Sequence, residues 1–265
     1  MNYLNDKETS QCAHPCSCAA DCLLQNITGT MQSNFASAQV LLGLKTAILV
    51  YIGPTIAEVA ALSTYKPLLA FLLGLGSPAV NFARLFRCID FREPFVRPLS
   101  TSSRVWCTHL ARQKIIVRTV VQIFSYVGAL LAIANNAYNS VYTDFRTISG
   151  WRCSIRLMPL LWSVLAVGVH ILGMLAVRVR LLDGYRPSIR CAIQSNFYLR
   201  AAAAGENTAP SEALLWVASL CSIGHMVFGI LVLSSLVFIS ASEAFQVFAM
   251  YAASAGLCRH GPSSE

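Results

Sequence analysis

The chain has 265 residues, of which 55% are hydrophobic and 12% are charged, whereas soluble domains carry about 25% charged residues. This composition excludes a water-soluble globular protein, and the low polarity excludes disorder over most of the chain. The formal net charge of +8 would suggest nucleic-acid binding in a soluble protein, but here the basic residues lie between apolar segments. They therefore indicate membrane topology, and we expect an integral membrane protein that contacts lipid and binds no nucleic acid.

Residues 1–35 are polar and are expected to form a tail on the lumenal or extracellular side. They contain no apolar core followed by a small-residue cleavage site, so no cleavable signal peptide is predicted. Asn26 begins an Asn-Ile-Thr tripeptide, which can accept an N-linked glycan only on the oxidising side of the membrane. A lumenal tail therefore predicts glycosylation of Asn26.

Residues 40–62 form the first apolar segment long enough to cross a hydrocarbon core of about 30 Å. Lys45, Pro54 and Glu58 interrupt this segment, and Pro54 predicts a kink in its helix. The next apolar segment, residues 67–83, is shorter and contains glycine and proline in its second half. Its length and composition predict a re-entrant segment or a fifth membrane segment.

Residues 84–118 carry eight Lys and Arg against two acidic residues, and a second basic segment covers 178–212. Cytosolic loops are enriched in Lys and Arg, so both segments are assigned to the cytosol and both chain ends to the opposite side. The membrane domain is expected over residues 36–240. Residues 241–265 are expected to form a C-terminal tail, with an amphipathic helix over 245–257 along the outer interface. The four predicted spans are residues 40–62, 119–138, 157–177 and 213–240.

The predicted topology places an even number of cysteines on the oxidising side, which favours disulfide pairing. The alternative for the N-terminal cluster is metal ligation by thiolates with His14. The cluster lacks the paired C-x2-C spacing of a structural zinc site, so no metal site is predicted. The disulfide candidates are Cys12, Cys16, Cys18, Cys22, Cys153 and Cys258.

Several polar side chains fall within the predicted membrane segments, where they are costly and therefore candidates for function. Lys45 and Glu58 lie on nearly opposite helix faces and can each extend to an interface, which is the favoured interpretation. Gly168 lies two residues before His170, and Gly224 lies directly before His225. Such small neighbours favour a role in helix packing over a metal or haem site for both histidines. The candidate set is Lys45, Glu58, Gln122, Asn135, His170 and His225.

Three segments, residues 34–44, 53–63 and 67–81, resemble a family of uncharacterised multi-pass membrane proteins from filamentous fungi. The resemblance implies a fungal origin and a helical membrane fold, and it implies no activity. Lys45 departs from the family pattern, in which an uncharged residue is expected. This departure argues against a functional charge at Lys45.

The predicted fold is an all-α integral membrane protein with four transmembrane helices plus one re-entrant or fifth membrane segment, in the plasma membrane or an endomembrane. The chain contains no nucleophile elbow, P-loop, dinucleotide fingerprint or zinc-protease motif, so no catalytic residue and no cofactor are predicted. A non-enzymatic accessory, scaffold or receptor-like component, with a membrane protein partner or a second copy, is therefore favoured. One alternative is a small transporter or channel, which requires the six polar side chains to converge on one cavity. The other is a membrane-embedded, cyclase-like enzyme of lipid or secondary metabolism, with Glu58 or Asp90 as its acid.

Overall fold

A computed structural model describes residue 18 and residues 22–64, 66–81, 115–149, 156–184 and 209–260. Four helices of this part are long and apolar enough to cross a membrane, namely Gly29–Ile52, Thr119–Arg146, Met158–Val179 and Ala209–Ser234. The prediction of an all-α membrane fold with four spanning helices is therefore confirmed. The elements are α2 (Gly29–Ile52), α3 (Ile56–Ser63), α4 (Pro67–Gly76), α7 (Ile115–Arg146), β1 (Ile148–Ser149), α8 (Met158–Gly184), α10 (Ala209–Ser234), β2 (Leu236–Val237) and α11 (Ala241–His260).

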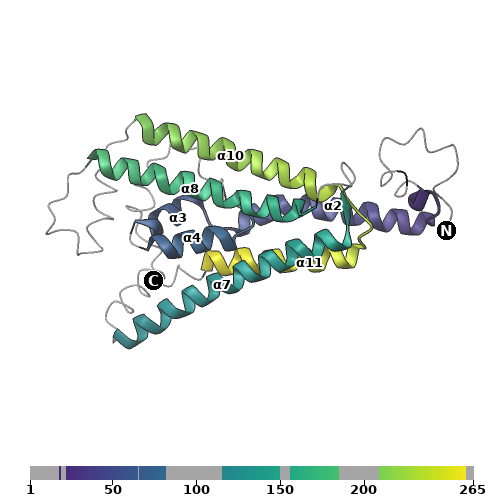
Figure 1. The fold of residues 1–265 in the computed structure, drawn as a ribbon, viewed down its shortest axis with the longest axis horizontal. Helices are drawn as coiled ribbons and strands as arrows, with labels where there is room; N and C mark the ends of the chain where they lie inside the picture. The colour runs from purple at the N-terminus through teal and green to yellow at the C-terminus, as the bar shows by residue number, and fades with distance from the viewer. Residues whose placement is uncertain are drawn as a thin grey trace.

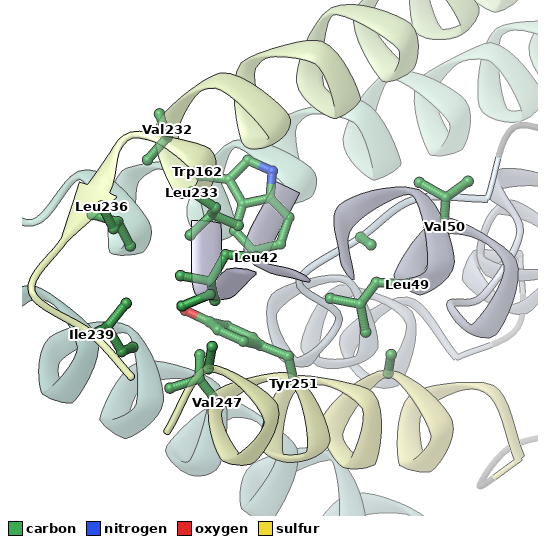
Figure 2. Packing of buried hydrophobic residues seen from close by; sticks show 14 residues of the cluster. Leu42, Leu49, Val50, Trp162, Val232, Leu233, Leu236, Ile239, Val247 and Tyr251 are labelled. Atoms are coloured by element: carbon green, nitrogen blue, oxygen red, sulfur yellow. The ribbon is translucent and has the colours of Figure 1, made fainter. Parts of the chain in front are cut away.

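The long helices form a bundle in which α2 lies between two helix pairs (Figure 1). One pair is α8 with α10, and the other is α7 with α11. The main apolar core lies where these helices meet, and it contains the two largest fully buried side chains, Trp162 and Tyr251. Figure 2 shows both rings among aliphatic side chains of α2, α10 and α11. The core is thus formed by helices from both ends of the sequence.

The first predicted span is divided into two helices instead of forming one kinked helix. The helix α2 ends at Ile52, and α3 begins at Ile56. Pro54 has no backbone N–H to continue the helical ladder, and Thr55 has an extended backbone. The Thr55 side chain accepts from the Glu58 backbone N–H, while Glu58 accepts from the Thr55 backbone N–H at 2.9 Å. This capping box starts a new helix after the break.

The segment predicted as re-entrant begins as the ten-residue helix α4, which is too short to cross a bilayer. Pro67 occupies its first turn, where a missing N–H costs nothing. The chain then becomes extended, and the backbone N–H of Asn81 donates to the Pro54 carbonyl at 3.2 Å. Residues 53–81 therefore return to their starting point, and we call them the α3–α4 hairpin. The hairpin packs against α7 and α8.

Residues 241–260 do not form a tail or an interfacial helix; they form α11 within the bundle. The Ala241 backbone N–H donates to Asn34 at 3.0 Å, and Arg259 donates to the Tyr51 carbonyl at 2.6 Å. The helix α11 therefore runs parallel to α2 over most of its length. Its inner face lies against α2 and α7, and burial against them replaces the expected contact with the membrane surface. The buried residues on this face are Ala244, Val247, Tyr251, Ser254, Ala255 and Cys258.

Candidate functional site at the helix break

Irregular backbone lies inside the bundle where α2, α3 and α4 meet. Residues 53 and 54 are buried, and so are residues 77–81. Non-helical backbone at membrane depth is tolerated only where protein covers it or where it lines an aqueous path. Here the polar groups bond one another, since Ser77 Oγ donates to the Ala79 carbonyl at 2.7 Å and Gly53 N donates to Leu49 at 2.8 Å. We call residues Gly53 to Thr55 the helix break.

Gly53 allows the two arms of the hairpin to approach each other closely. A Cβ added at this residue would lie 2.7 Å from the carbonyl oxygen of Ala79 and 3.3 Å from that of Leu49. Both neighbours are backbone atoms, which cannot move aside as a flexible side chain can. The φ angle of Gly53 is −64°, so the need for glycine comes from space and not from backbone conformation.

Lys45 lies on α2 seven residues before Ile52, which corresponds to about 10 Å along the helix. Its side chain is 0% exposed, and its Nζ has no hydrogen-bond partner. The Nζ lies 4.3 Å from the ring centroid of Tyr251, a cation–π distance. The prediction that Lys45 extends to an interface is therefore wrong, because α10 and α11 cover this face of α2.

Lys45 is the one Lys, Arg, Asp or Glu that is buried among the side chains whose burial is described. The described acidic side chains are exposed or half-buried. No described carboxylate is therefore available inside the bundle to balance an ammonium group at Lys45.

A hydrogen-bonded series connects the surroundings of Lys45 with the end of α4. The Tyr251 hydroxyl shares a hydrogen bond of 2.8 Å with Ser140, which also bonds the carbonyl of Asn136. The Asn136 amide donates to Ser163 at 2.6 Å and to the Leu75 carbonyl at 3.3 Å. This series ties α7 and α11 to the last turn of α4.

Aromatic side chains of α8, α10 and α11 meet in the interior. Trp162 stacks on His225 with 5.5 Å between ring centroids. It also meets Tyr251 edge-on at 5.7 Å, and Figure 2 shows these two rings. His225 Nε2 lies 2.8 Å from the Trp162 carbonyl. His170 is 0% exposed, and neither ring nitrogen has a partner. Its ring lies against Gly74 of α4, where an added Cβ would contact it at 3.4 to 3.6 Å.

The predicted polar set does not converge on one site. Lys45, His170 and His225 lie in the interior, whereas Asn135 joins α7 to α11 by donating to the Met250 carbonyl and to Ser254, each at 2.8 Å. Gln122 is exposed, and Glu58 is an exposed capping residue. Further polar and aromatic side chains of the interior lie outside the predicted candidate set, because the apolar helix pattern does not indicate which of them meet. They are Asn136, Ser140, Trp162, Ser163 and Tyr251.

Some of the predicted modification sites of the N-terminal tail lie within the described residues. Asn26 is exposed, and its side-chain amide donates to the Cys22 carbonyl at 2.8 Å. Cys22 and Cys258 are free thiols, against the predicted pairing. Cys258 lies inside the bundle beside Gly76, whereas Cys22 is exposed. Cys18 is disulfide-bonded. The described residues contain no group of three or more potential metal ligands. The candidates that lie outside the described residues are Cys12, His14, Cys16, Asp90 and Cys153.

No family model, curated protein or solved structure matches the chain.

Proposed function

We propose that the protein is a small transporter or channel, and the helix break carries this proposal, together with the buried, unpartnered Lys45 about 10 Å before it along α2. The proposal does not rest on the six polar side chains predicted from the sequence, because they do not converge on one site. A discontinuous helix that meets a short re-entrant helix is the arrangement in which many transporters hold solutes near the bilayer midplane. In this chain α2 and α3 are the two parts of the discontinuous crossing, and α4 is the re-entrant helix. The C-terminal ends of α2 and α4 meet the N-terminal end of α3, so unlike helix dipoles adjoin at the break.

An accessory or scaffold role explains the interior less well. Structural packing favours apolar side chains, because a charged side chain at the centre of a membrane helix costs about 3 kcal/mol on insertion scales. Lys45 lies within the bundle without a described counterion, and His170 has two unbonded nitrogens. Groups of this kind in membrane helices generally mark paths of ions, protons or solutes.

The orientation that we propose follows from the basic segments. The start of α7, the end of α8 and the start of α10 lie at the same end of the bundle, together with the α3–α4 turn (Figure 1). Residues 82–114 precede this start of α7, and residues 185–208 connect α8 to α10. Placing this end in the cytosol agrees with the positive-inside rule. The start of α2, with Asn26 before it, then faces the lumen or exterior. The end of α11 faces the cytosol, which corrects the prediction that both chain ends share one side, because α11 runs parallel to α2. A glycan at Asn26 that is lost in Asn26→Gln would support this orientation.

The function is tested by flux measurements on the purified protein in proteoliposomes. The panel contains potassium, chloride, acetate and glycerol, with a membrane potential of either sign. We expect flux of at least one solute above that of empty vesicles, and a strong reduction in Gly53→Val, which places a side chain against Ala79 at the break. Gly29→Val is the matched control, because nothing lies within 4 Å of that position. Equal leakage with and without folded protein for every solute would refute the proposal.

A further inference from the structure

We infer that Lys45 forms an interior binding site for a small monovalent anion, such as a halide or a short carboxylate. That this anion is also the transported solute rests on the proposed function. That it binds at Lys45 depends only on the surroundings of this side chain.

The electrostatic balance of the interior favours an anion over a cation. Protonated Lys45 carries one positive charge, and no Asp or Glu with described burial is buried to neutralise it. Burial alone favours the neutral amine, so a bound anion is what would hold the charged form. An uncompensated charge in a low-dielectric interior strongly attracts an opposite charge and repels a like one. A single anion neutralises the site, whereas a divalent anion leaves a buried negative charge.

The geometry leaves the donors of Lys45 free for a ligand. The centroid of the Tyr251 ring lies 4.3 Å from the Nζ, on one side of it. The ring attracts a cation but is not a conventional hydrogen-bond acceptor, so it does not satisfy the three N–H donors of the ammonium group. The Tyr251 hydroxyl shares its hydrogen bond with Ser140. The Nζ has no hydrogen-bond partner in the described part of the chain.

The neighbours of Lys45 on its own helix limit the polarity of the ligand. Leu42 and Leu49, one turn away on either side, are each 0% exposed and belong to the apolar core. These neighbours offer no hydrogen bonds to a large polar ligand. A compact anion that bonds the ammonium group and contacts aliphatic carbon suits the site best.

The test measures binding without transport. The full-length protein in nanodiscs is melted in sodium chloride, acetate or sulfate, each against sodium gluconate at equal ionic strength. We expect the midpoint to rise with the logarithm of chloride or acetate concentration, as it does for a ligand that binds only the folded state. Lys45→Gln should lose this dependence, with binding weakened by roughly 100-fold or more, and Lys45→Arg should retain it. Lys66→Gln, which changes a lysine in the α3–α4 turn, should behave as the wild type.

The possible outcomes separate the two proposals. No anion dependence in the wild type, or the same dependence in Lys45→Gln, overturns the binding site. A larger rise of the midpoint in sulfate than in chloride also overturns the binding site. Anion binding without solute flux supports the site and refutes the transporter, whereas flux without binding at Lys45 does the reverse. If Lys45→Gln does not fold, the wild-type titration and Lys45→Arg still decide.

Discussion

Gly229 lies where α10 meets both α8 and α2, and its replacement by alanine tests this packing. An added Cβ would overlap Trp162 Nε1 and would lie 2.7 Å from Thr46 Cγ2. Trp162 cannot turn aside easily, because His225 stacks on its face and Tyr251 meets it edge-on. We therefore expect Gly229→Ala to destabilise the protein by separating α10 from its two neighbours.

The magnitude follows from the cost of overpacking a core. One extra carbon in a close-packed interior costs about 1–3 kcal/mol, and the fixed indole places Gly229→Ala near the upper value. A loss of about 3 kcal/mol corresponds to a fall in the unfolding midpoint of roughly 6–12 °C for a chain of this size. Gly224→Ala is the matched control on the same helix, since nothing lies within 4 Å of that position.

The assay is thermal unfolding in a mild detergent, followed by the loss of monodisperse protein. Trp162→Leu removes the whole indole ring, including the overlapping nitrogen, so Gly229→Ala should cost less in that background than in the wild type. Such coupling is the mark of direct contact in a double-mutant cycle. Equal midpoints for Gly229→Ala and Gly224→Ala, or strict additivity with Trp162→Leu, would refute the packing of α8, α10 and α2.

Three further predictions test other parts of the structure. Gly53→Ala should destabilise the protein by about 1–3 kcal/mol, because its Cβ meets a backbone carbonyl, whereas Gly29→Ala should have no such effect; equal thermal midpoints would contradict this. The backbone N–H of Ser240 bonds the Glu243 carboxylate and lowers its pKa below the ordinary 4.5. This stabilisation is present above pH 4.5 and is lost as the pH falls towards the lower folded pKa. The thermal midpoint of Glu243→Gln should therefore depend less on pH than that of the wild type, over a range of about pH 5 to 3. Cys258 is 0% exposed, so a membrane-permeant maleimide should label it only after denaturation, and rapid labelling of native protein would contradict the position of α11.

The tertiary structure changed the interpretation of three features for identifiable physical reasons. Proline occurs within intact transmembrane helices, so Pro54 alone could not distinguish a kink from the end of α2; the return of Asn81 to the Pro54 carbonyl maintains the break. The helix α11 contains Glu243 and other polar residues, and its interior position follows from burial against α2 and α7. The position of Lys45 depended on which helices cover that face of α2.

The sequence by itself determined the membrane class, the four spanning helices and the separation of the basic segments from the apolar ones. These features follow from the local composition, because a run of about 20 apolar residues must leave water whatever its neighbours are. The tertiary structure alone decided which polar side chains meet. A helix that is apolar on all sides has no hydrophobic face to indicate its partners, so contacts such as Lys45 with Tyr251 arise only when α2 and α11 pack together.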